Sequence, residues 1–316
     1  MPRLHRYKSP ESDAASAVDK CDWIVESLKE RRTKASQRVK VFEEQFMSPC
    51  TTLTLGENIL GAVHDLAYVR AVESGEPRSL VESLGPPWSG SVFHRAVEYA
   101  YTLRRAVGEV DGTQRDGSSK RIVGSLGGSM HHARRACARF GSTFNGLVAA
   151  AQSLLSNGNA AGERAVLILD LDGSCGGGTA EMIAGINRVR LVDISVNDRD
   201  AYANTENASL QIVASAREYL DRLRSVLNSL DVAKEQNAVC IYSAGVDGFE
   251  GMDGGLGGMT AEVLAERDRM VFAWCRSVGL RTAYTLGGGE EALGCPRETL
   301  VALHRQTIEA AAMEAS

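Results

Sequence analysis

Residues 164–179 constrain the fold more than any other stretch of the chain, and they read RAVLILDLDGSCGGGT. An apolar run ends there in Asp170 and Asp172 and is followed by a glycine-rich segment. Runs of this kind form strands that are buried on both faces of a parallel sheet. Ligands of open α/β sheets bind beyond the carboxyl ends of the strands, so two acids at this point predict a cation site. The alternative is that Asp170 only caps or hydrogen-bonds nearby backbone.

Strand patterns alternate with helix patterns from residue 121 onward. After residues 121–126, further strands are predicted at 188–196, 238–244 and 280–286 besides the central one, and helices at 143–155, 210–230, 260–278 and 297–311. The preceding part is predicted to be helical at 13–32, 60–72 and 93–107, with a polar loop at 108–119. This alternation is typical of an α/β fold with a parallel sheet and helices on both faces. No linker of disordered composition divides the chain, so residues 1–316 are predicted to form a single domain.

Charge and cysteine usage exclude several classes of protein. The formal net charge of −5 gives no reason to expect a nucleic-acid partner. The seven cysteines are scattered and never occur as C-x-x-C, which argues against a disulfide framework and a cysteine-rich zinc site. The N-terminus is too polar for a signal peptide and no apolar run is long enough to span a membrane. A cytoplasmic protein without a membrane partner is therefore expected, with its oligomeric state left open.

Polar side chains follow the predicted strands at the points where those strands end. They are His131 and His132, then Asp170, Asp172 and Ser174, then Asp247, and finally Glu290. In a parallel sheet all of them open on the same edge. Carboxylates hold metal ions and imidazoles move protons, so this set indicates a hydrolytic centre. Each histidine alone could equally be a structural residue.

Several longer motifs occur in the order found in one family. They are GSLGGSMHHARR, FGSTFNGLVAAAQ, VLILDLDGSCGGGT, YSAGVDGFEG with LGGMTAEVLAERDRMVF, and TLGGGE with LVALHRQTIEAA. On these motifs the chain resembles the histone deacetylase-like amidohydrolases, a bacterial-type branch of the zinc-dependent arginase/deacetylase superfamily. The resemblance implies that superfamily's fold over nearly the whole chain.

The resemblance also implies roles for individual residues. Zn²⁺ would be held by Asp172, by Asp247 and by the residue at position 174. His131, backed by Asp170, would help to deprotonate the attacking water, and His132 would protonate the leaving amine. A structural K⁺ or Na⁺ would lie at Asp170, Asp172 and Ser195.

Two departures from the family pattern affect the expected chemistry. Ser174 stands where the family has a zinc-binding histidine, and a neutral hydroxyl is a much weaker zinc ligand than imidazole. Cys175 is a poor substitute, because neighbouring side chains at a strand end point to opposite sides. Glu290 stands where the family has a tyrosine that donates to the developing oxyanion, a loss that costs roughly 2–4 kcal/mol of transition-state stabilisation.

Three accounts of function remain open from the sequence. The first is an amidohydrolase acting on acetyl-lysine or a small acetylated amine, with altered metal chemistry and Glu290 as a replacement ligand or acid/base. The second is a non-catalytic relative that binds an acylated ligand or a protein partner. The third is that Ser174 was introduced to trap a complex. All three require the tandem histidines to lie within about a nanometre of Asp172 and Asp247.

Overall fold

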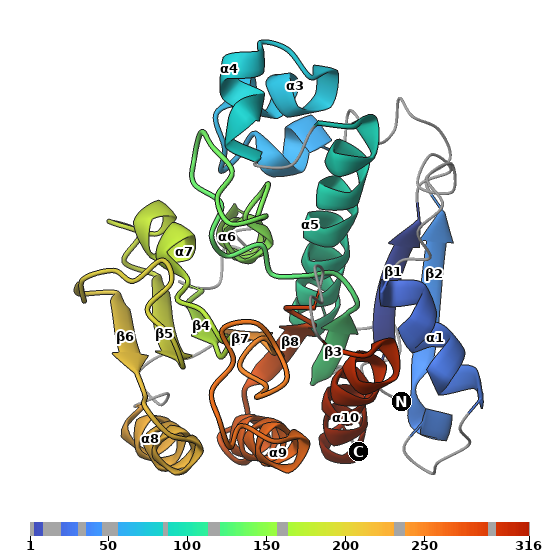
Figure 1. Ribbon diagram of the computed structural model, residues 1–316, viewed down its shortest axis with the longest axis vertical. Coiled ribbons are helices and arrows are strands. Elements are labelled where there is room, and N and C mark those ends of the chain that lie inside the picture. The colour runs from blue at the N-terminus through green and yellow to red at the C-terminus, as the bar shows by residue number, and fades with distance from the viewer. Residues whose placement is uncertain are drawn as a thin grey trace.

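One parallel sheet of eight strands forms the centre of the molecule, in the order β2-β1-β3-β8-β7-β4-β5-β6 (Figure 1). The computed structural model describes residues 3–8, 20–30, 36–45, 56–84, 88–112, 121–156, 164–230, 238–289 and 295–315. Its strands are β1 (Arg3–Lys8), β2 (Lys40–Gln45), β3 (Ile122–Ser125), β4 (Val166–Asp170), β5 (Val189–Ser195), β6 (Ala208–Ile212), β7 (Val239–Ser243) and β8 (Arg281–Thr285).

Helices cover both faces of this sheet (Figure 1). They are α1 (Lys20–Glu30), α3 (Leu66–Ser74), α4 (Arg78–Val81), α5 (Gly90–Asp111), α6 (Gly146–Ser156), α7 (Gly177–Met182), α8 (Ala216–Ser229), α9 (Ala261–Ser277) and α10 (Arg297–Glu314), with 3₁₀ turns η2 (Ser36–Arg38) and η3 (Glu82–Leu84). Helices α8, α9 and α10 lie on one face, and α5 and α6 lie on the other. The predicted α/β architecture is confirmed.

The alternation of side chains along β4 divides the core into two layers. Leu167 and Leu169 belong to the cluster that includes residues of α8, α9 and α10. Val166 and Ile168 belong to the cluster that includes residues of α5 and α6. Both faces of this strand are therefore buried, as the unbroken apolar run predicts.

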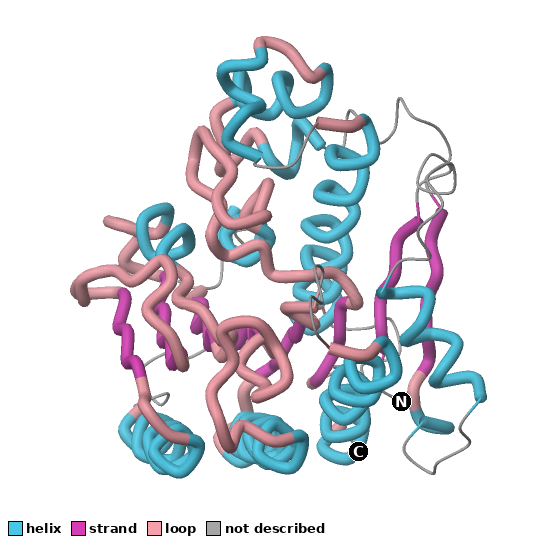
Figure 2. The backbone as a smooth tube through the Cα atoms, viewed as in Figure 1, coloured by secondary structure: helices cyan, strands magenta, loops and turns pink. Residues whose placement is uncertain are grey.

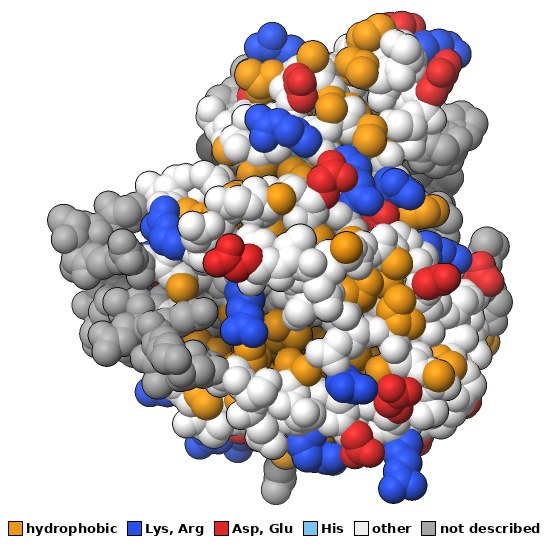
Figure 3. Space-filling view, turned by 90° about the vertical axis from the view of Figure 1, so that its left-hand side faces the viewer, with side chains coloured by type: hydrophobic (Ala, Val, Ile, Leu, Met, Phe, Trp, Pro, Cys, Tyr) orange, Lys and Arg blue, Asp and Glu red, His pale blue; other side chains and the backbone are white. Residues whose placement is uncertain are grey.

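The prediction of one long helix at residues 210–230 is wrong at its start. The first part is the edge strand β6, which pairs in parallel with β5. Helix α8 begins only after Ser215, whose side chain accepts a hydrogen bond from the Glu218 backbone N–H at 3.2 Å. The Glu218 carboxylate accepts in return from the Ala214 backbone N–H at 3.1 Å, so a reciprocal cap sets the helix boundary. Arginine and acidic side chains on the outer side of α8 form ion pairs four residues apart, and Figure 3 shows basic and acidic side chains on this side of the molecule.

From residue 121 onward, the other boundaries agree with the predictions to within a few residues. The helix predicted at 60–72 is interrupted by a turn and α3 begins only at Leu66, while α5 continues to Asp111, into the segment 108–119 that was predicted as a loop. The start of the helix predicted at 13–32 lies outside the described residues. Thr260 caps α9 by accepting from the Val263 backbone N–H, which is the capping chemistry expected there. Strands β1 and β2 were not predicted, because the basic residues of β1 and the acidic residues of β2 conceal an alternating strand pattern, although only β2 lies at the edge of the sheet. None of the helices in the described ranges combines the length and apolarity that crossing a bilayer requires.

The loops that matter for function follow the carboxyl ends of β3, β4, β5, β7 and β8. They lie beside one another near the middle of the molecule (Figure 2). The loops after β4 and β7 touch so closely that a Cβ on Gly173 would lie 2.4 Å from the Gly248 nitrogen. Because all the strands run in parallel, these loops form one polar edge of the sheet.

Candidate active site

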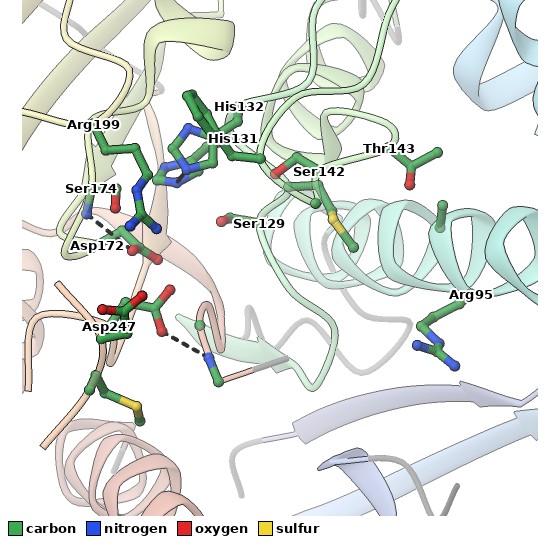
Figure 4. Close-up of a pocket in the computed structure, with 18 of the residues that line it drawn as sticks. Arg95, Ser129, His131, His132, Ser142, Thr143, Asp172, Ser174, Arg199 and Asp247 are labelled. Carbon is green, nitrogen blue, oxygen red and sulfur yellow. Dashed lines mark hydrogen bonds between the residues drawn. The ribbon is translucent and has the colours of Figure 1, made fainter. Parts of the chain in front are cut away.

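A cavity of about 300 Å³ opens at this edge and brings the predicted residues together. Its lining includes His131 and His132 from the loop after β3, Asp172 and Ser174 from the loop after β4, and Asp247 from the loop after β7 (Figure 4). The convergence predicted from the strand ends is therefore observed. Glu290 lies outside the described residues.

His131 is held by a buried carboxylate behind it. Its Nδ1 donates to Oδ2 of Asp170 at 2.7 Å, and Asp170 is fully buried at the end of β4. Since a carboxylate can only accept, Nδ1 must carry the proton. Gly176 makes the contact possible, because a Cβ there would lie 2.6 Å from the same carboxylate oxygen.

His132 has a carboxylate of its own, which the sequence did not predict. Its Nδ1 donates to Oδ2 of Asp200 at 3.0 Å, and Asp200 comes from the loop after β5. Arg134 donates to the other oxygen of Asp200 at 2.6 Å. The signal was available in the sequence, since an Asp-Arg-Asp segment (198–200) directly follows a predicted strand, as the other polar groups do.

The two imidazoles face each other across 3.2 Å between their Nε2 atoms. Because both Nδ1 atoms carry protons, a hydrogen bond between the Nε2 atoms needs a third proton on one of them. Burial opposes charge on His131, but the carboxylates of Asp170, Asp172 and Asp193 outweigh it and raise its pKa to about 10. Burial and the charge of His131 lower the pKa of His132 to about 4. The extra proton therefore lies on His131.

This charge state differs from the roles that the family resemblance implies. A protonated His131 cannot take a proton from water, whereas the neutral His132 can. The charges of the described residues thus favour His132 as the base and His131 as the acid. The resemblance implied the opposite assignment, in which a metal ion would offset part of the surrounding negative charge.

Hydrogen bonds of His64 and Asn145 hold the loop that carries both histidines. Nδ1 of His64 donates to the Arg134 carbonyl at 3.0 Å, and its Nε2 accepts from the Asn145 backbone N–H at 2.9 Å. The Asn145 amide donates to the His131 carbonyl at 3.3 Å. Burial lowers the pKa of His64 to about 4, which keeps the acceptor nitrogen unprotonated.

Asp172 and Asp247 are positioned by backbone donors and by glycines. Oδ1 of Asp172 accepts from the Gly173 backbone N–H at 2.7 Å, and Oδ1 of Asp247 accepts from that of Gly289 at 2.9 Å. A Cβ on Gly245 would lie 2.1 Å from Oδ2 of Asp172, so only glycine fits there. The side chains of these two acids both reach the cavity (Figure 4).

One buried arginine ties together the two loops that carry these acids. Arg267 on α9 donates from one guanidinium nitrogen to the carbonyls of Leu171, at 3.0 Å, and Gly245, at 2.5 Å. Its Nε donates to Asp268 at 2.8 Å, and Asp268 also accepts from Tyr242 and Thr307. Nothing in the sequence pattern of α9 marks this arginine, because its partners are backbone groups far away in the chain.

The donor set that the described residues supply at this edge does not fit a tightly held zinc ion. Protein zinc sites use at least three imidazole, thiolate or carboxylate ligands. Besides Asp172 and Asp247, the described residues offer only the Ser174 hydroxyl as a third ligand here. No three His, Cys, Asp or Glu side chains in the described ranges are placed to hold a metal ion. Cys175 does not supply the missing ligand, since its thiol is directed to the Asn197 carbonyl at 3.3 Å and burial raises its pKa to about 12.

Of the predicted monovalent-cation residues, Asp170 lies behind His131, whereas Asp172 lines the cavity. Oδ1 of Asp170 is buried and makes no hydrogen bond within the described part of the chain. The Ser195 hydroxyl donates to Asp193 at 2.7 Å, and Asp193 also accepts from the Gly176 backbone N–H. Burial and the nearby Asp170 raise the pKa of Asp193 to about 8. This extra acid was missed because it lies inside β5 rather than beyond its end.

Comparison with known proteins identifies the family. The histone deacetylase domain matches residues 16–304. The chain belongs to the histone deacetylase family. No curated protein matches the chain. Within this histone deacetylase domain, the paired histidines and the acids of the cavity come from the loops that the shared motifs occupy.

Proposed function

We propose that this histone deacetylase-family protein is a deacetylase-like amidohydrolase with an altered metal site. Its substrate would be an acylated amine, either acetyl-lysine in a peptide or a small acetylated amine, held in the cavity beside His131 and His132. The observation that carries the proposal is the contact of these imidazoles, each backed by a buried carboxylate, at the wall of a 300 Å³ cavity. Residues 1–316 would form a single domain.

The chemistry follows from the proton positions of the two histidines. Water adds to the acyl carbonyl and gives up a proton to the neutral His132. The C–N bond breaks as His131 donates its extra proton to the leaving nitrogen, and the products are a carboxylic acid and a free amine. This pair of transfers typically contributes 10²- to 10⁴-fold in rate, and no step in it depends on a tightly bound zinc ion.

An assay on an acetyl-lysine peptide and on N-acetylated diamines tests the proposal. We expect slow release of acetate by the wild-type protein and none by His132→Asn or His131→Asn. The double variant Ser174→His with Glu290→Tyr should turn over faster in the presence of Zn²⁺. Absence of acetate release from both the wild type and the double variant would refute the proposal.

A pseudo-deacetylase is the second candidate, and Ser174 is the observation that favours it. In this case the cavity binds the acylated ligand, or a protein partner that presents one, without hydrolysing it. Isothermal titration of the peptide separates the two candidates. Binding without acetate release, at every metal supplied, supports the second.

A further inference from the structure

Two charged side chains of the cavity have no role in the proposed chemistry. Arg199, in the loop after β5, and Asp253, in the loop after β7, both line the cavity and are exposed to solvent. Figure 4 shows the Arg199 side chain pointing into the cavity. In the described part of the chain, neither charged group has an ion-pair partner. The arginines of the loop after β3 differ, because Arg134 and Arg139 are already paired with Asp200.

Hydrogen bonds hold the loop that carries Arg199 against the loop that carries Asp253. The Asn197 side chain donates to the Gly254 carbonyl at 3.0 Å and accepts from the Arg199 backbone N–H at 3.0 Å. Nη2 of Arg199 would lie 3.7 Å from a Cβ on Gly254, the residue after Asp253. The Arg199 carbonyl in turn accepts from the Cys175 backbone N–H, in the loop after β4, at 2.9 Å. Arg199 therefore lies close both to the segment that carries Asp253 and to the loop that carries the proposed reaction centre.

The cavity offers different chemistry to different parts of a ligand. The two histidines are buried, whereas Arg199 and Asp253 are exposed. The partly buried side chains of Met130 and Met252 line the same cavity and supply apolar surface. A matching ligand has its amide at the histidines, an apolar stem along the methionines, and groups of both charges at its solvent-exposed end.

A free amino acid carries these two charged groups on its Cα. A guanidinium binds a carboxylate through two parallel N–H···O bonds, and a carboxylate accepts charge-assisted hydrogen bonds from an ammonium group. We propose that Arg199 and Asp253 form a subsite for the α-carboxylate and the α-ammonium group of a free amino acid that is acylated on its side-chain amine, as in Nε-acetyl-lysine. The proposal rests on the proposed function, because it names the substrate class of the same cavity. A lysine inside a peptide has neither charged group.

Three ligands that differ by single charged groups test this subsite. Nε-acetyl-L-lysine carries both groups, N-acetylcadaverine lacks the carboxylate, and 6-acetamidohexanoate lacks the ammonium group. Isothermal titration of the full chain at pH 7 measures their affinities without requiring turnover. We expect the wild type to bind Nε-acetyl-L-lysine at least about fivefold more tightly than either of the other two ligands.

Each variant should remove the preference for one group only. In Arg199→Gln, Nε-acetyl-L-lysine should bind no more tightly than N-acetylcadaverine, which should keep its wild-type affinity and so report an intact cavity. In Asp253→Asn, Nε-acetyl-L-lysine should bind no more tightly than 6-acetamidohexanoate, which should keep its wild-type affinity. Arg190→Gln is the matched control, because Arg190 is exposed on β5 and does not line the cavity, and it should match the wild type.

Equal affinities of the wild type for the three ligands, or no measurable binding of Nε-acetyl-L-lysine, overturn the inference. Equally tight binding of a peptide with an internal acetyl-lysine also overturns it. Acetate release from the same samples separates the inference from the proposed function. Preferential binding of Nε-acetyl-L-lysine without acetate release supports the pseudo-deacetylase and leaves the subsite standing. Acetate release with equal kcat/KM from all three ligands supports the amidohydrolase and refutes the subsite.

Discussion

Nε2 of His131 lies 3.2 Å from Nε2 of His132, and each ring is held at its other nitrogen by a buried carboxylate. Asp170, His131, His132 and Asp200 therefore form one continuous hydrogen-bonded chain along the cavity wall. The two ends of this chain differ. Asp200 is ion-paired with Arg134 and Arg139, whereas Asp170 contacts no arginine or lysine among the described residues. This asymmetry places the extra proton on His131.

Replacing Asp170 should move that proton. In Asp170→Asn we expect the pKa of His131 to fall well below its value of about 10, because the carboxylate 2.7 Å away is the strongest favourable charge on the imidazolium. The ¹³C and ¹⁵N shifts of His131, followed from pH 5 to 11, measure this pKa. Asp200→Asn is the control and should leave the pKa of His131 raised. An unchanged pKa in Asp170→Asn would contradict the assignment.

Acid should destabilise the protein through His64. A base whose pKa is depressed on folding adds stability above its unfolded pKa, near 6.5, and this stability is lost as the pH falls from about 6.5 to the folded pKa of about 4. At pH 4.5 the contribution lost is on the order of 2 kcal/mol. We expect the fall in urea-unfolding free energy between pH 7 and pH 4.5 to be smaller by about this amount in His64→Gln. Equal falls in the two proteins would exclude the effect.

The glycine beside Asp172 should not tolerate a methyl group. In Gly245→Ala the new Cβ would lie 2.1 Å from Oδ2 of Asp172, so the acid or the strand end must shift, at a cost of about 1–3 kcal/mol. Thermal unfolding and acetate release should both decline. Gly257→Ala is the matched control, because nothing lies within 4 Å of its Cβ, and it should stay within about 0.5 kcal/mol of the wild type. A Gly245→Ala protein as stable and active as the control would argue against this packing.

Restoring an imidazole at position 174 should restore zinc binding. Ser174→His adds a third strong ligand beside Asp172 and Asp247, which completes the set that protein zinc sites use. Zinc titration with a competing chelator should show an affinity at least about tenfold higher than for the wild type. Adding Asp247→Asn to Ser174→His should remove the gain. Equal affinities of the wild type and Ser174→His would show that position 174 does not face the ion.

Removing the buried guanidinium should loosen both acid-bearing loops. Arg267→Met leaves the Leu171 and Gly245 carbonyls without their donor and Asp268 without its ion pair, which typically costs about 3–5 kcal/mol. Chemical denaturation measures this loss. Arg269→Met, on the exposed side of the same helix, removes a surface ion pair with Glu266 and an exposed hydrogen bond to the Ala265 carbonyl, and should change stability by less than about 1 kcal/mol. Similar losses in the two variants would refute the special role of Arg267.

The elements that were predicted well are those whose pattern is local. The apolar run of β4, the Thr260 cap of α9 and the glycines after the strands each depend on neighbours within a few residues. Residues 210–230 were misjudged because the alternation in β6 merges with the helical periodicity of α8. Strands β1 and β2 were missed because charged residues interrupt their apolar positions and hide the strand pattern, both in the edge strand β2 and in β1 beside it.

The order of residues along the chain was enough to establish a parallel α/β sheet and to place His131, His132, Asp172 and Asp247 at one edge. Hydrophobic periodicity depends only on local geometry, and parallel strands bring their carboxyl ends to the same side. Which carboxylate contacts which imidazole depended on the tertiary structure. Asp200 contacts His132 because β5 lies beside β4 and Gly177 leaves room for it. Such contacts depend on how separate loops pack against one another, so a local pattern in the sequence does not predict which residues they join.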